Sequence, residues 1–356
     1  MKTRITELLN IRYPIVEAPM AWITDARLAA AVSEAGGLGT IGPNAGTEKV
    51  TSDVEETGER LRSQIRLCRE LTAKPFAVNF VVGVVGWDRK YSDRCVEVGI
   101  EEKVPVAIVS QGSPAVYTER MKQAGMTVIH VCSTVRHVIK AEMSGADAVV
   151  VSGTEGGGHS GFDQITTLCL VPQASDATNI PVIAGGGIVD ARGLTGALSL
   201  GADGIYMGTR FIATKECPAH DNVKQAILDA VDTSTMAIKH GSPVPMAVND
   251  KENRGFVEER RGSIRMLIND YLRGVMSKEG AITSFEQVMQ GDGESEMPSE
   301  SNRTVDAFIH GNLEFNSITS GQGAAMIWDI PSCGELVETI VGEARPIVDR
   351  LGAIFR

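Results

Sequence analysis

The sequence contains no closely spaced pair of cysteines. Its six cysteines are scattered without a CxxC pair, which argues against a zinc site or a disulfide framework and suits a reducing cytosol. Basic residues are not in excess either, and the formal net charge of −11 disfavours nucleic acid as a partner. No apolar run approaches the roughly 18 residues that span a bilayer, and the charged N-terminus lacks the apolar core of a signal peptide. We therefore expect a cytoplasmic protein that acts on a small molecule, without a metal or a membrane partner; a homodimer is left open.

The chain does contain a repeated pattern between residue 14 and about residue 210. A short apolar strand is followed by a break rich in Gly, Ser, Pro or Asn, and then by a helical stretch. Such alternation predicts βα units and a parallel sheet. The eight predicted strands are Ile15–Pro19, Leu38–Gly42, Phe76–Val82, Val106–Ser110, Thr127–Val131, Ala148–Ser152, Pro181–Ala184 and Gly204–Met207.

Helical patterns fill the segments between these strands. The predicted helices are Asp25–Ala35, Lys49–Leu71, Ala115–Ala124, Thr134–Ser144, Leu168–Ala177 and Ala191–Leu200. Several are followed by a glycine, as is common at helix ends: Gly36, Gly125, Gly145 and Gly201. Eight βα units in about 200 residues predict a (β/α)8 TIM barrel over residues 1–211. An open doubly wound sheet is the alternative.

The pattern stops after Phe211. Residues 212–330 are more polar, and we expect a mainly helical cap that carries the substrate specificity, with a helix over Arg254–Arg273. Residues 290–303 are acidic and turn-rich, which predicts an exposed loop. Residues 331–356 end in an amphipathic helix, from Gly334 to about Leu351, that is expected to pack back on the barrel.

One stretch follows the sixth predicted strand and combines glycines with a histidine. Gly156, Gly157 and Gly158 lead directly to His159. Glycines let the backbone approach a ligand closely, and a histidine at a strand end can transfer protons near neutral pH. Without its context, such a histidine is more often a hydrogen-bonded structural residue. Glu155 could orient it or be solvated.

Two further glycine loops follow the seventh and eighth strands. They contain Gly185-Gly186-Gly187 and Met207-Gly208-Thr209. In barrels of this type a phosphate is often bound after these two strands, by amide groups that glycine leaves accessible. Asp190 is expected to cap the helix that follows the first loop. The pair of loops predicts a phosphate-bearing cofactor.

Together with four other motifs, these loops resemble the nitronate monooxygenase family (formerly 2-nitropropane dioxygenases). Its FMN-dependent relatives are NAD(P)H:quinone reductases and flavin-type enoyl-ACP reductases. The other matches are Ala18-Pro19-Met20, Ala35-Gly36-Gly37-Leu38-Gly39, Lys74-Pro75-Phe76-Ala77-Val78-Asn79 and Glu155-Gly156-Gly157-Gly158-His159-Ser160-Gly161. They keep their order over residues 5–220, and a weaker match, Ser320-Gly321-Gln322, lies near the C-terminus.

The resemblance implies FMN as cofactor and His159 as the catalytic residue that faces the substrate. It implies that the flavin is lined by Ala18, Pro19, Met20, Asn79, Ser152, Gly157, Gly158, Gly185, Gly186, Gly187, Met207, Gly208 and Thr209. The amide of Asn79 offers a donor and an acceptor, which suits the pyrimidine edge of a flavin; otherwise Asn79 merely ends its strand. Met20 could cover the ring face or fill the core.

The sequence leaves three hypotheses for the reaction. The first is oxidation of alkyl nitronates by O2 to a carbonyl compound and nitrite. The second is an NAD(P)H-dependent reduction of quinones or 2-enoyl thioesters on the same flavin. The third, remote hypothesis is a phosphate-binding barrel without flavin, which would need a cysteine nucleophile after strand six; the next cysteine is Cys169, ten residues past His159.

Overall fold

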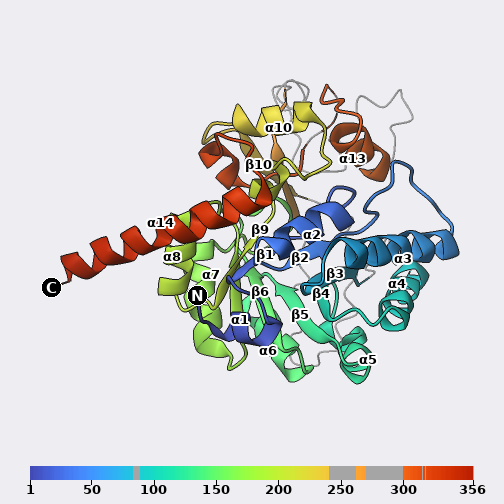
Figure 1. Cartoon of the computed structure of the whole chain (residues 1–356), viewed down its shortest axis with the longest axis horizontal. Coiled ribbons are helices and arrows are strands. Elements are labelled where there is room, and N and C mark those ends of the chain that lie inside the picture. Colours follow the sequence, from blue (N-terminus) through green and yellow to red (C-terminus); the bar gives the residue numbers. More distant parts are fainter. Residues whose placement is uncertain (83–88, 240–261, 270–299, 315, 317, 356) are drawn as a thin grey trace, which may run out of the picture.

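Eight parallel strands form one sheet in the order β1-β9-β8-β6-β5-β4-β3-β2, and helices surround it (Figure 1). This computed structural model describes residues 1–82, 89–239, 262–269, 300–314, 316 and 318–355. The strands are β1 Ile15–Glu17, β2 Gly39–Ile41, β3 Phe76–Val81, β4 Val106–Ser110, β5 Thr127–Cys132, β6 Ala148–Ser152, β8 Val182–Gly185 and β9 Gly204–Met207. All eight predicted strands are confirmed, with each end within two residues of its predicted position.

The edge strands β1 and β2 meet and nearly close the sheet into a barrel. Val16 and Leu38 form a parallel bridge, in which the Leu38 amide donates to the Ile15 carbonyl and the Glu17 amide to the Leu38 carbonyl. Beyond the bridge, the Thr40 amide donates to Glu17 Oε2 at 2.9 Å. A side chain thus takes the place of the next backbone acceptor. The architecture is a (β/α)8 barrel, and the open doubly wound alternative is wrong.

Helices connect the barrel strands, and short polar side chains begin several of them. The helices are α2 Ala26–Glu34, α3 Val54–Leu71, α4 Arg89–Glu101, η1 Pro114–Val116, α5 Thr118–Gln123, α6 Val135–Met143, α7 Thr167–Ala177, α8 Ala191–Ser199 and α9 Thr209–Ile212. Asp190 accepts hydrogen bonds from the amides of Arg192 and Gly193, which confirms the predicted cap of α8. The glycines expected after four helices all have positive φ: Gly36, Gly125, Gly145 and Gly201.

The barrel interior is apolar and is closed at its N-terminal end by α1 (Arg4–Leu9). Ile5 and Leu9 of this helix belong to the same buried cluster as the inward-facing strand residues. Arg4 forms an ion pair with Asp203, the residue before β9. The helix therefore plugs the bottom of the barrel and leaves the C-terminal ends of the strands for a ligand.

The inward-facing layer at the C-terminal ends is small or polar. Inward-facing residues lie two positions apart along a strand. The next inward residue after each strand's last member of the buried apolar cluster therefore belongs to the layer at the C-terminal end. The layer consists of Ala18, Thr40, Asn79, Ser110, Val131, Ser152, Gly185 and Gly208. Five members of this layer were predicted as cofactor-binding residues.

The segment after the barrel contains strands as well as helices. Its described elements are α10 Asp221–Leu228, β10 Thr235–Lys239, β11 Ser263–Leu267, α13 Glu300–Phe308 and η2 Gln322–Met326. Strand β11 pairs antiparallel with β10 and with β7 (Gly158–Ser160), the strand that carries His159. The predicted helix over Arg254–Arg273 is wrong at Ser263–Leu267, where Ile264 and Met266 alternate with polar side chains as in a strand.

Two other predictions for this region have different outcomes. In the predicted loop over 290–303, residues 290–299 lie outside the described part of the chain, and 300–303 belong to α13. The C-terminal helix is confirmed as α14, Cys333–Ile354. Its first half packs on the barrel through Leu336, Val337 and Ile340, while its end projects away from the body (Figure 1). Among the described residues, no helix is long and apolar enough to cross a membrane.

Candidate functional site

Glycine loops after β8 and β9 lie at the C-terminal end of the barrel, as predicted. Gly186 and Gly187 have φ values of +101° and +71°, a conformation that other residues rarely adopt. A Cβ on Gly186 would lie 2.7 Å from Thr167 Oγ1. Within the described residues, the amides of Gly186, Gly187, Gly208 and Thr209 donate to no protein acceptor. The two loops therefore present amide hydrogens that an anionic group could accept.

A third segment, Ser320–Gly323, joins these loops from the far end of the sequence. The Gly321 amide donates to Thr209 Oγ1 at 3.0 Å, and the Gln322 amide to the Glu155 carbonyl at 2.9 Å. A Cβ on Gly157 would lie 2.6 Å from the Gly321 nitrogen. Sequence reasoning indicated this segment only through a weak motif match. Its proximity to the glycine loops depends on the chain's return over more than 100 residues from Thr209.

The Ser320 hydroxyl is buried at this junction without a partner. Ser320 is 0% exposed, and its Oγ makes no hydrogen bond within the described part of the chain. An unpaired buried hydroxyl is energetically costly. Its position beside Gly157 and Gly321 is therefore consistent with a ligand that supplies the missing hydrogen bond.

The β1 side of the site is formed by Ala18 and Met20. A Cβ on Gly208 would lie 3.5 Å from both Ala18 Cβ and Met20 Sδ, so these predicted residues are brought together, with Pro19 between them. Met207 is different: its side chain is buried in the core between barrel and helices, and only its carbonyl reaches the site region, where it accepts from the Ala18 amide at 2.8 Å.

Asn79 is held in a fixed orientation on the inner face of β3. Its Nδ2 donates to the Ile108 carbonyl at 2.9 Å and to Ser110 Oγ at 3.1 Å. The side chain is 7% exposed. The strand continues to Val81, so Asn79 does not end it, and its contact with a flavin stays a prediction.

The loop after β6 is held by Glu155 in a way that the sequence did not predict. The Glu155 carboxylate accepts from the amide and the hydroxyl of Thr167 at 2.9–3.0 Å. Thr167 Oγ1 also lies 3.0–3.1 Å from the carbonyls of Gly185 and Gly186. Glu155 therefore ties the start of α7 to the loop after β6, and it is neither simply solvated nor assigned to His159 by these contacts.

His159 lies in the three-stranded sheet and not in a free loop. It is exposed and pairs with Ile264 of β11. The neighbouring Arg265 is buried and donates to the Thr154 carbonyl at 2.8 Å and to Thr235 Oγ1 at 3.2 Å. Burial lowers the pKa of Arg265, and the charge of Glu155 opposes this effect. The position of His159 thus depends on residues about 100 positions later in the sequence.

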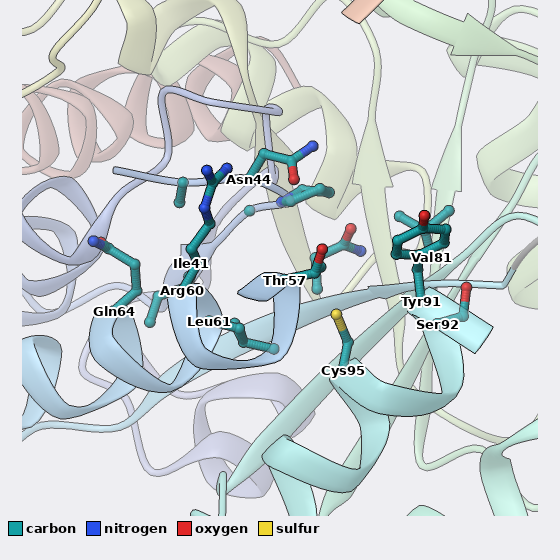
Figure 2. Close-up of a pocket in the computed structure, with 14 residues that line it drawn as sticks. Ile41, Asn44, Thr57, Arg60, Leu61, Gln64, Val81, Tyr91, Ser92 and Cys95 are labelled. Carbon is teal, nitrogen blue, oxygen red and sulfur yellow. The ribbon is translucent and has the colours of Figure 1, made fainter. Parts of the chain in front are cut away.

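A separate pocket opens beside Asn79 (Figure 2). It lies between α3, α4 and the ends of β2 and β3, and its volume is about 620 Å³ with the solvent at its mouth included. Of the predicted site residues, Asn79 alone lines it. Sequence reasoning missed this pocket because, apart from Asn79, its lining residues belong to none of the predicted motifs.

The chain is similar to known proteins over nearly its whole length. The family described as nitronate monooxygenase matches residues 2–343. A Rhodococcus jostii protein named (3aS,4S,5R,7aS)-5-hydroxy-7a-methyl-1-oxo-octahydro-1H-indene-4-carboxyl-CoA dehydrogenase is 31% identical, over 99% of both chains. A probable nitronate monooxygenase of Staphylococcus saprophyticus is 30% identical, over 98% of this chain and 99% of that protein.

Solved structures extend the likeness to the whole fold. FabK from Thermotoga maritima is 34% identical and superposes with a TM-score of 0.81, over 99% of both chains. A nitroalkane oxidase from Streptomyces ansochromogenes is 27% identical, with a TM-score of 0.74 over 98% of this chain and all of that chain. The chain therefore belongs to the nitronate monooxygenase family of oxidoreductases.

Proposed function

We propose that this protein is an FMN-dependent oxidoreductase that converts alkyl nitronates to a carbonyl compound and nitrite with O2. The observation that carries the proposal is the convergence of the loops after β6, β8 and β9 on the Ser320–Gly323 segment, which contains the unpaired Ser320 hydroxyl. Members of this family typically depend on FMN, and two of the relatives above are named for nitronates or nitroalkanes.

The residues present fit FMN. Amides of Gly186, Gly187, Gly208 and Thr209 would hold the phosphate, with the Ser320 hydroxyl as an additional donor. The small inward layer formed by Ala18, Asn79, Ser152 and Gly185, with Met20 beside it, would leave room for the ring. When bound, FMN would supply the redox chemistry, which amino-acid side chains do not provide.

The chain's own residues would handle the proton and the substrate. His159 would accept the proton from the carbon beside the nitro group when a neutral nitroalkane is the substrate. Arg265 and β11 would hold the strand that carries His159, and Asn79, with its Nδ2 already used, would present its side-chain oxygen toward the ring.

Absorbance and nitrite release test the proposal together. The purified protein should show the visible absorbance of oxidised flavin and should release nitrite from propionate-3-nitronate or from alkyl nitronates in air. His159→Gln should lose activity with the neutral nitroalkane far more than with the preformed nitronate, because the latter needs no base. A yellow protein that releases no nitrite would contradict the nitronate reaction, and a protein that cannot be loaded with FMN would contradict the cofactor.

A second candidate keeps the flavin and makes NAD(P)H the reductant of a 2-enoyl thioester or a quinone. It is favoured by the FabK structure, which matches along the whole chain with a TM-score of 0.81, and by the acyl-CoA name of the Rhodococcus relative. Rapid anaerobic bleaching of the flavin by NADH or NADPH, followed by reoxidation with crotonyl-CoA or a quinone, would support it. Absence of bleaching with either nucleotide would exclude it.

A further inference from the structure

The pocket beside Asn79 exposes more apolar than polar surface. Leu61 of α3 and Cys95 of α4 face each other across it, with Tyr91 beside Val81 at one side (Figure 2). Ile41 and Pro43, from the end of β2, complete the apolar wall.

Three polar side chains in the wall form hydrogen bonds with the protein. Gln64 Oε1 accepts from the Ala26 amide at 2.9 Å. Thr57 Oγ1 donates to the Asp53 carbonyl at 2.8 Å, and the Tyr91 hydroxyl to the Ser52 carbonyl at 2.5 Å. The hydroxyl hydrogens of Thr57 and Tyr91 are therefore not available to an occupant.

The charge at the pocket is also neutralised. Arg60 donates to Glu56 Oε1 and to the Lys49 carbonyl, each at 2.6 Å. Cys95 adds no charge, because burial raises the pKa of its thiol to about 11. Arg60, the one cationic side chain among the described lining residues, is already paired with Glu56. An apolar chain would displace water from an apolar wall.

We propose that this pocket holds the alkyl or acyl chain of the substrate. Asn79 connects it to the barrel mouth, because this residue lines the pocket and also belongs to the inward layer where the flavin ring is proposed. One molecule could then place its reacting carbon over the barrel and its apolar tail between α3 and α4. The inference rests on the proposed function for the reacting end, but the pocket itself can be tested without turnover.

A chain-length series on pocket variants provides the first test. The substrates are the nitronates of nitroethane, nitrobutane and nitrohexane. Because burial of each methylene contributes about 0.8 kcal/mol, kcat/KM should rise roughly fourfold for each added methylene that enters the pocket. Leu61→Trp should lower kcat/KM most for the hexyl compound and progressively less for shorter ones. Leu71→Trp, the same change at an exposed end of α3, should leave the series unchanged. A series that is flat in the parent, or that Leu61→Trp does not alter, would overturn the proposal.

Protection of Cys95 provides a second test that needs no activity and no variant. Octanoate should slow labelling of Cys95 by methyl methanethiosulfonate several-fold, measured by peptide mass spectrometry, while propionate should not. Cys169, exposed on α7, serves as the internal control. Protection of Cys95 without nitrite release would support the pocket proposal and contradict the nitronate reaction. Nitrite release without Cys95 protection or a chain-length preference would support the nitronate reaction and contradict the pocket proposal.

Discussion

Gly157 is the residue whose lack of a side chain matters most to the proposed flavin site. A Cβ there would lie 2.6 Å from both the Gly321 nitrogen and the Ser320 carbonyl carbon, and backbone atoms cannot move aside cheaply. Gly157→Ala should displace Ser320–Gly323 from the phosphate loops. We expect FMN affinity to fall by roughly tenfold or more, the equivalent of about 1.4 kcal/mol, as measured by fluorescence quenching during reconstitution of the apoprotein.

Gly196→Ala is the matched control for this prediction. Gly196 lies within α8 and has open space around its missing Cβ, so alanine should leave FMN affinity unchanged and raise stability by about 0.5–1 kcal/mol through helix propensity. Equal FMN affinities in the two variants would show that the segment around Ser320 does not form the flavin site.

Glu17 supplies a pH-dependent prediction at the seam between β1 and β2. The side chain is 0% exposed, its Oε1 has no partner among the described residues, and burial raises its pKa well above the ordinary value. The folded state therefore retains a proton that the unfolded state releases, and stability contributed by the neutral acid is lost as pH rises above the ordinary carboxyl range. Glu17→Gln keeps an oxygen for the Thr40 amide without titrating, so it should become more stable relative to the parent as pH increases.

Urea unfolding of both proteins at about pH 5 and about pH 8 checks this sign. Glu70→Gln, an exposed change on α3, should show no such trend. A stability difference between parent and Glu17→Gln that stays constant or shrinks with rising pH would contradict a protonated Glu17.

Individual side chains were only partly predictable from the sequence. Asn79, Ser152 and Gly185 were assigned to the site through the family resemblance, and the structure places them in the inward layer at the barrel mouth. The alternation of inward and outward residues along a strand turns the Met207 side chain outward into the core. Glu155 could not be assigned because its partner, Thr167, lies twelve residues later across a loop whose conformation no local pattern specifies.

At the level of secondary structure, the link between β7 and β11 determines where His159 lies. Arg265 supports that link through Thr154, so Arg265→Met should leave the Thr154 carbonyl without its donor. We expect a loss of about 1–3 kcal/mol in local stability and a decrease in kcat/KM of roughly tenfold. If Arg265 positions His159, the decrease should be larger for a neutral nitroalkane than for its nitronate.

Arg192→Met controls for the loss of an arginine. Arg192 pairs with Asp190 on the exposed side of α8, where an ion pair contributes about 0–1 kcal/mol, so this variant should retain its activity. An equal loss with nitroalkane and nitronate in Arg265→Met would assign Arg265 to general stability and not to the positioning of His159.

The elements of the barrel were predictable, whereas strands β7, β10 and β11 were not. The difference lies in how far apart in the sequence the contacting residues are. Each barrel strand is a short apolar run next to its own helix, and the pattern repeats eight times. Strand β11 is five residues long and is defined by partners about 30 and 100 residues earlier. Its flanking sequence has helical composition, and the helix that this composition predicts over Arg254–Arg273 is wrong at Ser263–Leu267. Residues 254–261 and 270–273 lie outside the described part of the chain.

For the molecule as a whole, the two ends of the barrel contribute to different properties. Stability is concentrated at the N-terminal end, where α1 plugs an apolar interior, and the proposed chemistry lies at the C-terminal end. Ile5 is 0% exposed within this plug. Ile5→Ala should therefore cost about 2–5 kcal/mol in the free energy of unfolding, measured by denaturant titration of the apoprotein.

The same variant should bind FMN with parental affinity at temperatures where it remains folded, because no residue of the glycine loops contacts α1. Gly157→Ala should show the opposite combination, a weakened flavin site on a barrel of nearly parental stability. A loss of FMN affinity in Ile5→Ala would mean that the interior transmits strain from one end to the other. The small inward layer around Asn79 would then be shaped by the packing beneath it, and the chain-length preference proposed for the α3–α4 pocket should shift in Ile5→Ala as well.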